Sequence, residues 1–404
     1  MDRSTGTAVR RVTGALLWAR YLLLAAGCAI PVIRALGSLP QDWLLFETAA
    51  RITLWGRGRY QLDGGALDIY AEMPRIQFGP PAILATMPLQ YLPIRWSLIA
   101  AEGLMMACGL TCVWVVERLA ALAGVPYRRR ALATVLGGVP FLYAWSLLAV
   151  DWMHIEDVIA LTCAAFALLA LRRDRWWAMA ALLGVAAAAK PWAVVLWPLV
   201  FALPRPRRAP AALVALIAAV AWWLPYVVAN PGTVAAIGSI PVPVHQDAAV
   251  RLLGVASGGL LPSPVRFLQF GLAAAAAFVA VRRGLWYVAP AAALIVRVVT
   301  DSQTWPYYAA EPILGALLVD AVRGRRIPWL TAVVAAVELG LPHLGVPLLT
   351  AAARACLLLV PLALLAAGTA RRGRASVPGP AEPAVGAPAD AAAEAVPTPV
   401  AVLQ

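Results

Sequence analysis

Long apolar runs follow one another along this 404-residue chain, and short polar segments separate them. Most runs approach the ~20 residues that a helix needs to cross a bilayer, and several are shorter. This pattern predicts an all-α polytopic membrane protein. The twelve predicted spans are Tyr21–Leu36, Trp96–Ala123, Ala131–Val150, Ile155–Leu171, Trp177–Ala189, Pro191–Leu203, Ala211–Ala229, Val265–Val281, Leu285–Thr300, Pro306–Val322, Pro328–Leu344 and Pro347–Thr369.

Arginine clusters fill the gaps between these runs. With twelve spans, every cluster falls on the same side as the N-terminus, and adding or dropping one early span would scatter the later ones. Because positive loops remain in the cytoplasm, we expect a protein of the plasma membrane with both termini cytoplasmic. The clusters are Arg128–Arg130, Arg172–Arg173, Arg205–Arg208, Arg282–Arg283, Arg323–Arg326 and Arg371–Arg374.

Composition supports this class. Hydrophobic residues make up 62% of the chain and charged residues 13%, which is outside the range of soluble domains. The net charge of +13 comes from the topology clusters, and aromatic residues do not interleave with them, so we expect no nucleic-acid partner. The five cysteines lie in apolar runs and predict neither disulfides nor a metal site. We therefore expect no cofactor and no metal; the sequence leaves the oligomeric state open.

The segment from 37 to 93 is the first external loop in this topology. Within it, Pro81–Leu92 is too short to cross a bilayer, so we expect a surface or half-penetrating helix beside an external cavity. Residues 1–374 form one predicted transmembrane domain. Residues 375–404 form an Ala- and Pro-rich tail, predicted to be disordered in the cytoplasm.

Asp42 opens an amphipathic run in this loop, with Phe46, Ala49 and Thr53 on its helical face. It can cap the helix. It can also act as a general base, because partial burial raises the pKa of a carboxyl toward the range useful for proton abstraction.

Lys190 is the single lysine among 33 basic residues, and it lies between two short apolar runs, next to Pro191. An ammonium at this place either snorkels to the interface or serves a function, and a cation suits a phosphate.

The turn DWMHIED at 151–157 places His154, Glu156 and Asp157 between two spans. It is either an interfacial polar turn or a site that binds sugar hydroxyls, and we find no further ligand to complete a metal site. Farther along, Arg297 can pair with Asp301 at one-turn spacing. The neighbouring aromatic residues belong either to an interfacial aromatic belt or to a platform for a sugar ring. They are Trp305, Tyr307 and Tyr308.

The first external loop resembles that of the polyprenol-phosphate-mannose-dependent α-1,2-mannosyltransferases, which are glycosyltransferase family 87 in the GT-C superfamily. The matching positions are Asp42, Phe46, Ala50, Leu54, Gly58, Tyr60, Gln77, Phe78, Pro80, Pro81, Pro88 and Pro93. The segment from 186 to 203, AAAAKPWAVVLWPLVFAL, also looks like the Lys-Pro segment of that family. The resemblance covers about the first 210 residues.

The resemblance implies a GT-C-like bundle of about twelve helices with external juxtamembrane helices. It also implies an inverting transfer of a mannosyl or related unit from a polyprenyl-phosphate donor to a glycolipid or glycan on the external face. Asp42 would then be the general base. The residues assigned to the donor phosphate are Lys190, His154 and Arg59, and those assigned to substrate binding are Tyr60, Glu156, Asp157, Trp192, Arg297 and Tyr307.

A transporter or a flippase for lipid-linked sugars is the alternative, because twelve spans are common in transporters. Transporters often carry broken helices at matching places in two repeated halves. The break at Lys190 and Pro191 has no counterpart in the second half of this sequence. We therefore favour the enzyme.

Overall fold

The computed structural model describes residues 3–36, 38–56, 65–73, 76–238 and 243–372. The described part is helical and holds no β-strand apart from an isolated bridge between Pro243 and Leu260. The all-α prediction is therefore confirmed. The elements that run along the bundle are α1 (Arg3–Ala35), α5 (Ile94–Leu122), α6 (Tyr127–Ser146) with η3 (Leu147–Asp151), α7 (Ile155–Arg172), α8 (Trp176–Ala189), η4 (Pro191–Ala202), α9 (Arg205–Ala229), α11 (Ser263–Arg282), α12 (Ala289–Thr300), α13 (Ala310–Val322), α14 (Trp329–Ala335) with η7 (Ala336–Gly340) and η8 (Leu341–Leu344), and α15 (Pro347–Leu357) with α16 (Leu359–Arg372).

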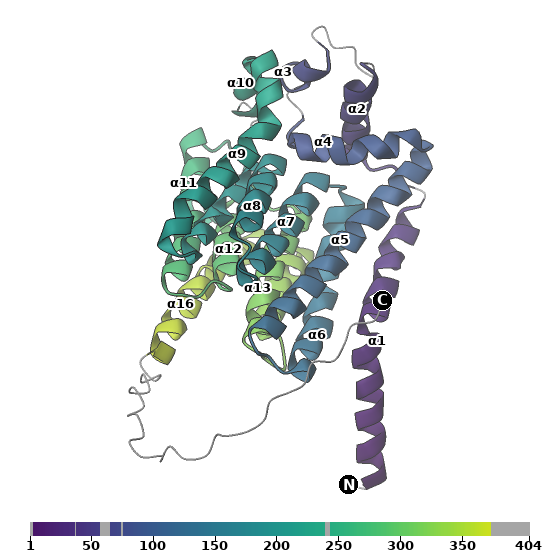
Figure 1. The fold of residues 1–404 in the computed structure, drawn as a ribbon, viewed down its shortest axis with the longest axis vertical. Coiled ribbons are helices and arrows are strands. Elements are labelled where there is room, and N and C mark those ends of the chain that lie inside the picture. Colours follow the sequence, from purple (N-terminus) through teal and green to yellow (C-terminus); the bar gives the residue numbers. More distant parts are fainter. Residues whose placement is uncertain (1–2, 37, 57–64, 74–75, 239–242, 373–404) are drawn as a thin grey trace, which may run out of the picture.

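Several short elements belong to the connections at one end of the bundle, the upper end in Figure 1. They are α2 (Gln41–Trp55), η1 (Ala66–Asp68), α3 (Ile69–Glu72), α4 (Pro80–Thr86), η2 (Met87–Tyr91), α10 (Gly232–Gly238), η5 (Ala249–Leu253) and η6 (Pro306–Ala309). Figure 1 shows α4 lying across the upper end of the bundle. That Pro81–Leu92 is a surface or half-penetrating helix on the external side stays a prediction.

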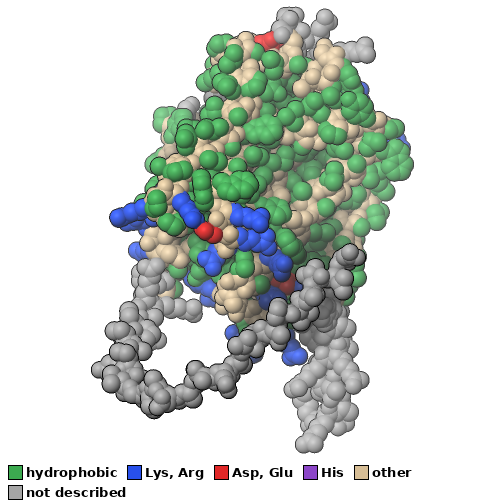
Figure 2. All heavy atoms as spheres, viewed as in Figure 1, with side chains coloured by type: hydrophobic (Ala, Val, Ile, Leu, Met, Phe, Trp, Pro, Cys, Tyr) green, Lys and Arg blue, Asp and Glu red, His purple; other side chains and the backbone are tan. Residues whose placement is uncertain are grey.

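The outer surface of the bundle identifies a membrane protein. Large apolar side chains such as Leu213, Ile217 and Leu224 of α9 are about half exposed. Figure 2 shows a broad apolar band, with Lys and Arg side chains gathered below it. A contiguous apolar surface of this extent fits lipid rather than water. Within the described residues, five stretches are long and apolar enough to cross a bilayer: Ile94–Leu122, Tyr127–Asp151, Arg205–Ala229, Pro264–Arg282 and Pro347–Ala367.

The two short predicted spans around Lys190 form a hairpin. Trp197 of η4 donates its indole N–H to the carbonyl of Leu183 in α8 at 3.3 Å, and both residues lie seven positions from Lys190. The two segments therefore run antiparallel, with Lys190 at the turn. Because a 3₁₀-helix rises ~2.0 Å per residue, the 12 residues of η4 cover roughly 24 Å, more than an α-helix of that length would.

Gly79 joins the first external loop to this turn. Its N–H donates to the carbonyl of Ala189 at 2.9 Å. A Cβ at this position would lie 1.6 Å from the carbonyl oxygen of Ala188, so only glycine allows the approach. The loop that carries Asp42 is thus held against the residue before Lys190.

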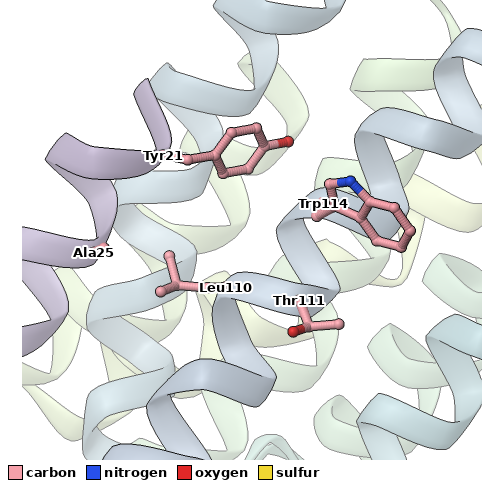
Figure 3. Close-up of a pocket in the computed structure, with 5 residues that line it drawn as sticks. All are labelled: Tyr21, Ala25, Leu110, Thr111 and Trp114. Carbon is pink, nitrogen blue, oxygen red and sulfur yellow. The ribbon is translucent and has the colours of Figure 1, made fainter. Parts of the chain in front are cut away.

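The cavities in the described part of the bundle include a larger and a smaller one. The larger, of about 330 Å³, opens between α1 and α5 and is shown in Figure 3; its lining residues are Tyr21, Ala25, Leu110, Thr111 and Trp114. The smaller, of about 20 Å³, is enclosed by apolar side chains of α5, α7, η4, α12 and α13. Neither is lined by a residue that the sequence analysis assigns to the site. The cavity predicted beside the first external loop stays a prediction.

Candidate active site

Asp42 lies in the first turn of α2, which begins at Gln41 after Pro40. The helix therefore starts before Asp42, and Asp42 is not its N-cap. The same face of the helix is anchored one turn later, because Phe46 is buried and stacks on Phe78 with ring centroids 4.0 Å apart. The side chain of Asp42 is 34% exposed, and its Oδ2 lies 3.5 Å from Nε2 of His154. The anchored helix thus presents a partly accessible carboxylate to the polar turn.

That turn connects η3 to α7 through a strained backbone. Met153 has a φ of +55°, a value that residues other than glycine rarely adopt, and its side chain is fully buried. The N–H of His154 donates to the carbonyl of Leu148 at 3.0 Å. Glu156 and Asp157 follow in the first turn of α7, where the positive end of the helix dipole favours carboxylates.

Lys190 completes the cluster from the tip of the α8–η4 hairpin. Its Nζ donates to Oε1 of Glu156 at 2.7 Å and lies 3.4 Å from Oδ2 of Asp157. The indole N–H of Trp192 donates to the other oxygen of Asp157 at 2.7 Å. Nδ1 of His154 shares the Oε1 atom of Glu156 at 2.9 Å. The polar turn and the hairpin tip, which lie about 35 residues apart in the sequence, therefore meet at one point. Asp42, which precedes them by about 110 and 150 residues, joins them through His154.

The charges of this cluster nearly cancel. Burial would lower the pKa of His154, but the carboxylates of Glu156 and Asp157 outweigh it and raise that pKa to about 9. The imidazole is therefore protonated at neutral pH. Burial also raises the pKa of Asp42, and the cations of His154 and Lys190 oppose that rise. The cluster thus carries two cations and three carboxylates, and Asp42 is the most exposed of the three carboxylates.

Arg297 of α12 packs against the cluster through the ring of Trp192. Its guanidinium pairs with Glu311 at 2.5 Å and lies 3.6 Å from Asp301. It is held between two rings, 4.8 Å from the centroid of Trp192 and 4.9 Å from that of Tyr308. Arg297 therefore supports the indole that contacts Asp157, while its own charge is compensated.

An aromatic wall borders the cluster on one side. Tyr307 stacks on the imidazole of His154 at 4.0 Å and contacts Trp152 at 5.6 Å. Trp305 lies 5.0 Å from Trp152 and is stacked at 6.5 Å on Tyr307. Trp152 and Trp305 are half-buried, whereas Tyr307 is buried. We call Trp152, Trp305 and Tyr307 the aromatic wall.

Most of the residues predicted for the site thus come together. Asp42, His154, Glu156, Asp157, Lys190 and Trp192 form one connected cluster, with Arg297 and Tyr307 packed against it. Arg59 and Tyr60 lie outside the described residues. The cations of His154 and Lys190 pair with the carboxylates of this cluster. The sequence analysis treated each motif separately and did not predict these ion pairs. Their roles toward a substrate stay predictions.

His154, Glu156 and Asp157 also bring possible metal-ligand atoms within 4.8 Å of one another. Lys190 already lies against both carboxylates of this group. A divalent ion bound by the same oxygens would have to displace that ammonium or lie beside it. The donor set therefore favours an internal ion-pair cluster.

Sequence reasoning missed Trp152, although it belongs to the same polar turn as His154. A tryptophan beside two candidate polar residues was a usable signal. It also missed His245, which lies between α10 and η5, far from the other site residues in sequence. No local pattern marks His245, and only the fold brings it to this end of the bundle.

No protein-family model and no curated protein matches this chain. Among solved structures, the chain is similar to the crystal structure of ArnT from Cupriavidus metallidurans bound to undecaprenyl phosphate. The two share 18% sequence identity over 89% of this chain and 79% of that chain, with a TM-score of 0.46.

Proposed function

We propose that this chain is a GT-C-like membrane glycosyltransferase. It transfers a mannosyl or related unit from a polyprenyl-phosphate donor to a glycolipid or glycan acceptor at the external face, with inversion. The proposal rests on the resemblance of the first external loop and on one geometric observation. Asp42, the most exposed carboxylate of the cluster, lies 3.5 Å from a cationic imidazole, which shares Glu156 with Lys190.

Asp42 is suited to the role of general base. Burial raises its pKa, which makes it a stronger proton acceptor than an ordinary aspartate. Asp42 takes the proton of an acceptor hydroxyl, and the oxygen attacks the anomeric carbon of the donor. A new C–O bond forms as the bond to the phosphate oxygen breaks, and the phosphate leaves with the electron pair. One displacement inverts the anomeric centre, so a β-linked donor gives an α-linked product.

The leaving phosphate needs positive charge. Lys190 uses one of its three N–H donors on Glu156 and lies near Asp157, which leaves donor capacity for a phosphate oxygen. His154 is the second cation at this point. The carboxylates of Glu156 and Asp157 keep both cations charged and in place when no donor is bound. They act as positioning residues in this mechanism.

The position of the cluster favours an enzyme over a transporter. Its residues lie at the ends of helices, in the first turns of α2 and α7 and at the tip of the α8–η4 hairpin. Transporter sites of the broken-helix type lie near the bilayer midplane. A site at the helix ends fits substrates that react at the membrane surface.

The test is a transfer assay with a defined product. Proteoliposomes with the purified protein receive radiolabelled β-linked polyprenyl-phosphate mannose and membrane glycolipid, with protein-free liposomes as the control. We expect label in a new glycolipid whose glycosidic bond is cleaved by an α-mannosidase. Label that crosses the bilayer while remaining on the polyprenyl phosphate would refute the enzyme and favour the flippase.

A further inference from the structure

A second polar group adjoins the aromatic wall at Trp305. The Nδ1 atom of His245 lies 2.6 Å from the hydroxyl of Thr304, and the His245 N–H donates to the carbonyl of Ser302 at 2.8 Å. The imidazole lies 6.2 Å from the ring of Trp305. The mechanism above uses none of these groups.

Asp247 fixes the segment that carries His245. The carbonyl of Asp247 accepts a hydrogen bond at 3.4 Å from Arg354, whose guanidinium is buried and pairs with Glu338 at 2.9 Å. The buried ion pair between Arg354 of α15 and Glu338 of η7 therefore contacts the backbone of this segment. A segment anchored at both Ser302 and Arg354 presents His245 in a defined orientation.

The imidazole of His245 retains an available hydrogen-bonding nitrogen. Thr304 occupies Nδ1, and the side chain is 37% exposed. Nε2 is then a donor or an acceptor according to the tautomer, and a hydroxyl group can satisfy either. Beside it, half-buried Trp305 offers an aromatic ring. The face of such a ring is negative and attracts the weakly positive C–H groups of a sugar.

We propose that His245 and Trp305 form a second sugar-binding subsite, which takes a hydroxyl-bearing ring of the acceptor. This inference rests on the proposed function, because the acceptor supplies the ring. The aromatic wall connects the subsite to His154 through Tyr307, and His154 contacts Asp42. One sugar ring at Asp42 and the next at Trp305 would thus lie at two places that are linked through packed rings. The donor phosphate belongs at the opposite side of the cluster, with Lys190.

Binding can be measured without any reaction. The purified protein in nanodiscs is titrated with an alkyl α-mannoside, and contact is followed by saturation-transfer NMR. Trp305→Leu should weaken binding about tenfold, because it removes the stacking face together with its apolar area. Trp305→Phe keeps a ring and should retain most of the affinity. His245→Gln should weaken binding about fivefold, as expected for one neutral hydrogen bond.

Matched controls use residues remote from the subsite. His343→Gln and Trp329→Leu change exposed side chains of the same types and should leave mannoside binding unchanged. Asp42→Asn should keep the binding even if transfer is lost, so this test is separate from the test of the proposed function. Equal affinities for Trp305→Leu and the wild type, or an equal loss in Trp305→Phe and Trp305→Leu, would overturn the stacking subsite.

Steady-state kinetics can test whether the sugar ring bound at His245 and Trp305 belongs to the acceptor. In the transfer assay with an alkyl dimannoside as acceptor, whose two rings can occupy both places, His245→Gln should raise the KM for the dimannoside about fivefold and leave that for the donor unchanged. A rise confined to the KM of the donor would contradict the acceptor assignment.

Discussion

Two buried polar clusters of this protein can be compared directly. At the lower end, Glu117 of α5 is bound by Arg20 through two hydrogen bonds of 3.0 and 2.6 Å, and it accepts a third from Tyr21 at 2.5 Å. At the upper end, Glu156 receives Lys190 and His154 on one oxygen, while its other oxygen has no hydrogen-bond partner within the described residues. Both oxygens of Glu117 thus accept hydrogen bonds, whereas the carboxylate of Glu156 retains unused hydrogen-bonding capacity.

This difference indicates that the lower cluster has a structural role, whereas the upper cluster is a candidate reactive site. Glu117 is bonded through both oxygens, so it has little left to offer a ligand. It links α1 to α5 and, with Arg130 3.6 Å away, to the start of α6. At the upper end the neighbouring Asp42 is partly exposed and carries a raised pKa. Perturbed and incompletely satisfied groups are more often functional than saturated ones.

The largest effect is expected from Lys190→Met. The change leaves Glu156 and Asp157 buried without their ammonium partner, which should cost roughly 3–5 kcal/mol of stability and impair use of the donor. The thermal midpoint in detergent and the KM for the donor measure the two effects, with Lys190→Arg as the charge-conserving control. Normal donor saturation would show that the donor phosphate binds elsewhere. An unchanged midpoint would show that Lys190 does not stabilise Glu156 and Asp157.

Glu117→Gln should affect stability alone. Removing this carboxylate leaves Arg20 without its charged partner, at a cost of about 3 kcal/mol. The specific transfer activity of the remaining folded protein should equal that of the wild type. The measurement pairs the thermal midpoint with transfer per folded molecule. A variant that keeps its stability but loses transfer would reverse the roles that we assign to the two clusters.

The upper cluster should make two properties depend on pH: transfer activity at low pH and stability at high pH. Transfer should fall as the pH drops through the raised pKa of Asp42, because the protonated carboxyl cannot accept the proton of the acceptor. His154 has a pKa raised from 6.5 to about 9, so its contribution to stability is complete below about 6.5 and is lost as the pH rises through about 9. His154→Gln should remove that alkaline loss. A thermal midpoint with the same alkaline dependence in both proteins would contradict the assignment to His154.

The smallest effect is expected from Trp192→Phe. The phenyl ring preserves packing beneath Arg297 but leaves one oxygen of Asp157 without its donor. We expect a loss of roughly 1–2 kcal/mol in stability and a decrease of a few fold in transfer. Thermal unfolding and initial rates measure it. A decrease as large as that of Lys190→Met would show that Trp192 contacts substrate itself.

The sequence predicted the helical class and the position of the broken hairpin well, because apolar runs and Pro191 act locally. It also selected Asp42, His154 and Lys190, since a charged residue stands out against apolar surroundings. It could not show that Lys190 pairs with Glu156 and Asp157, or that His245 approaches Trp305. Those contacts depend on how distant helices pack, and no periodicity encodes them. The capping role considered for Asp42 was wrong, because α2 starts one residue earlier, at Gln41.

The most direct test of the account is the turnover number of purified Asp42→Asn in the mannosyl transfer assay. Asparagine keeps the size of the side chain but cannot take the proton, so we predict a loss of about 10²–10⁴-fold, with an unchanged thermal midpoint and unchanged donor affinity. Transfer at the wild-type rate would contradict the central claim that Asp42 is the base of this site.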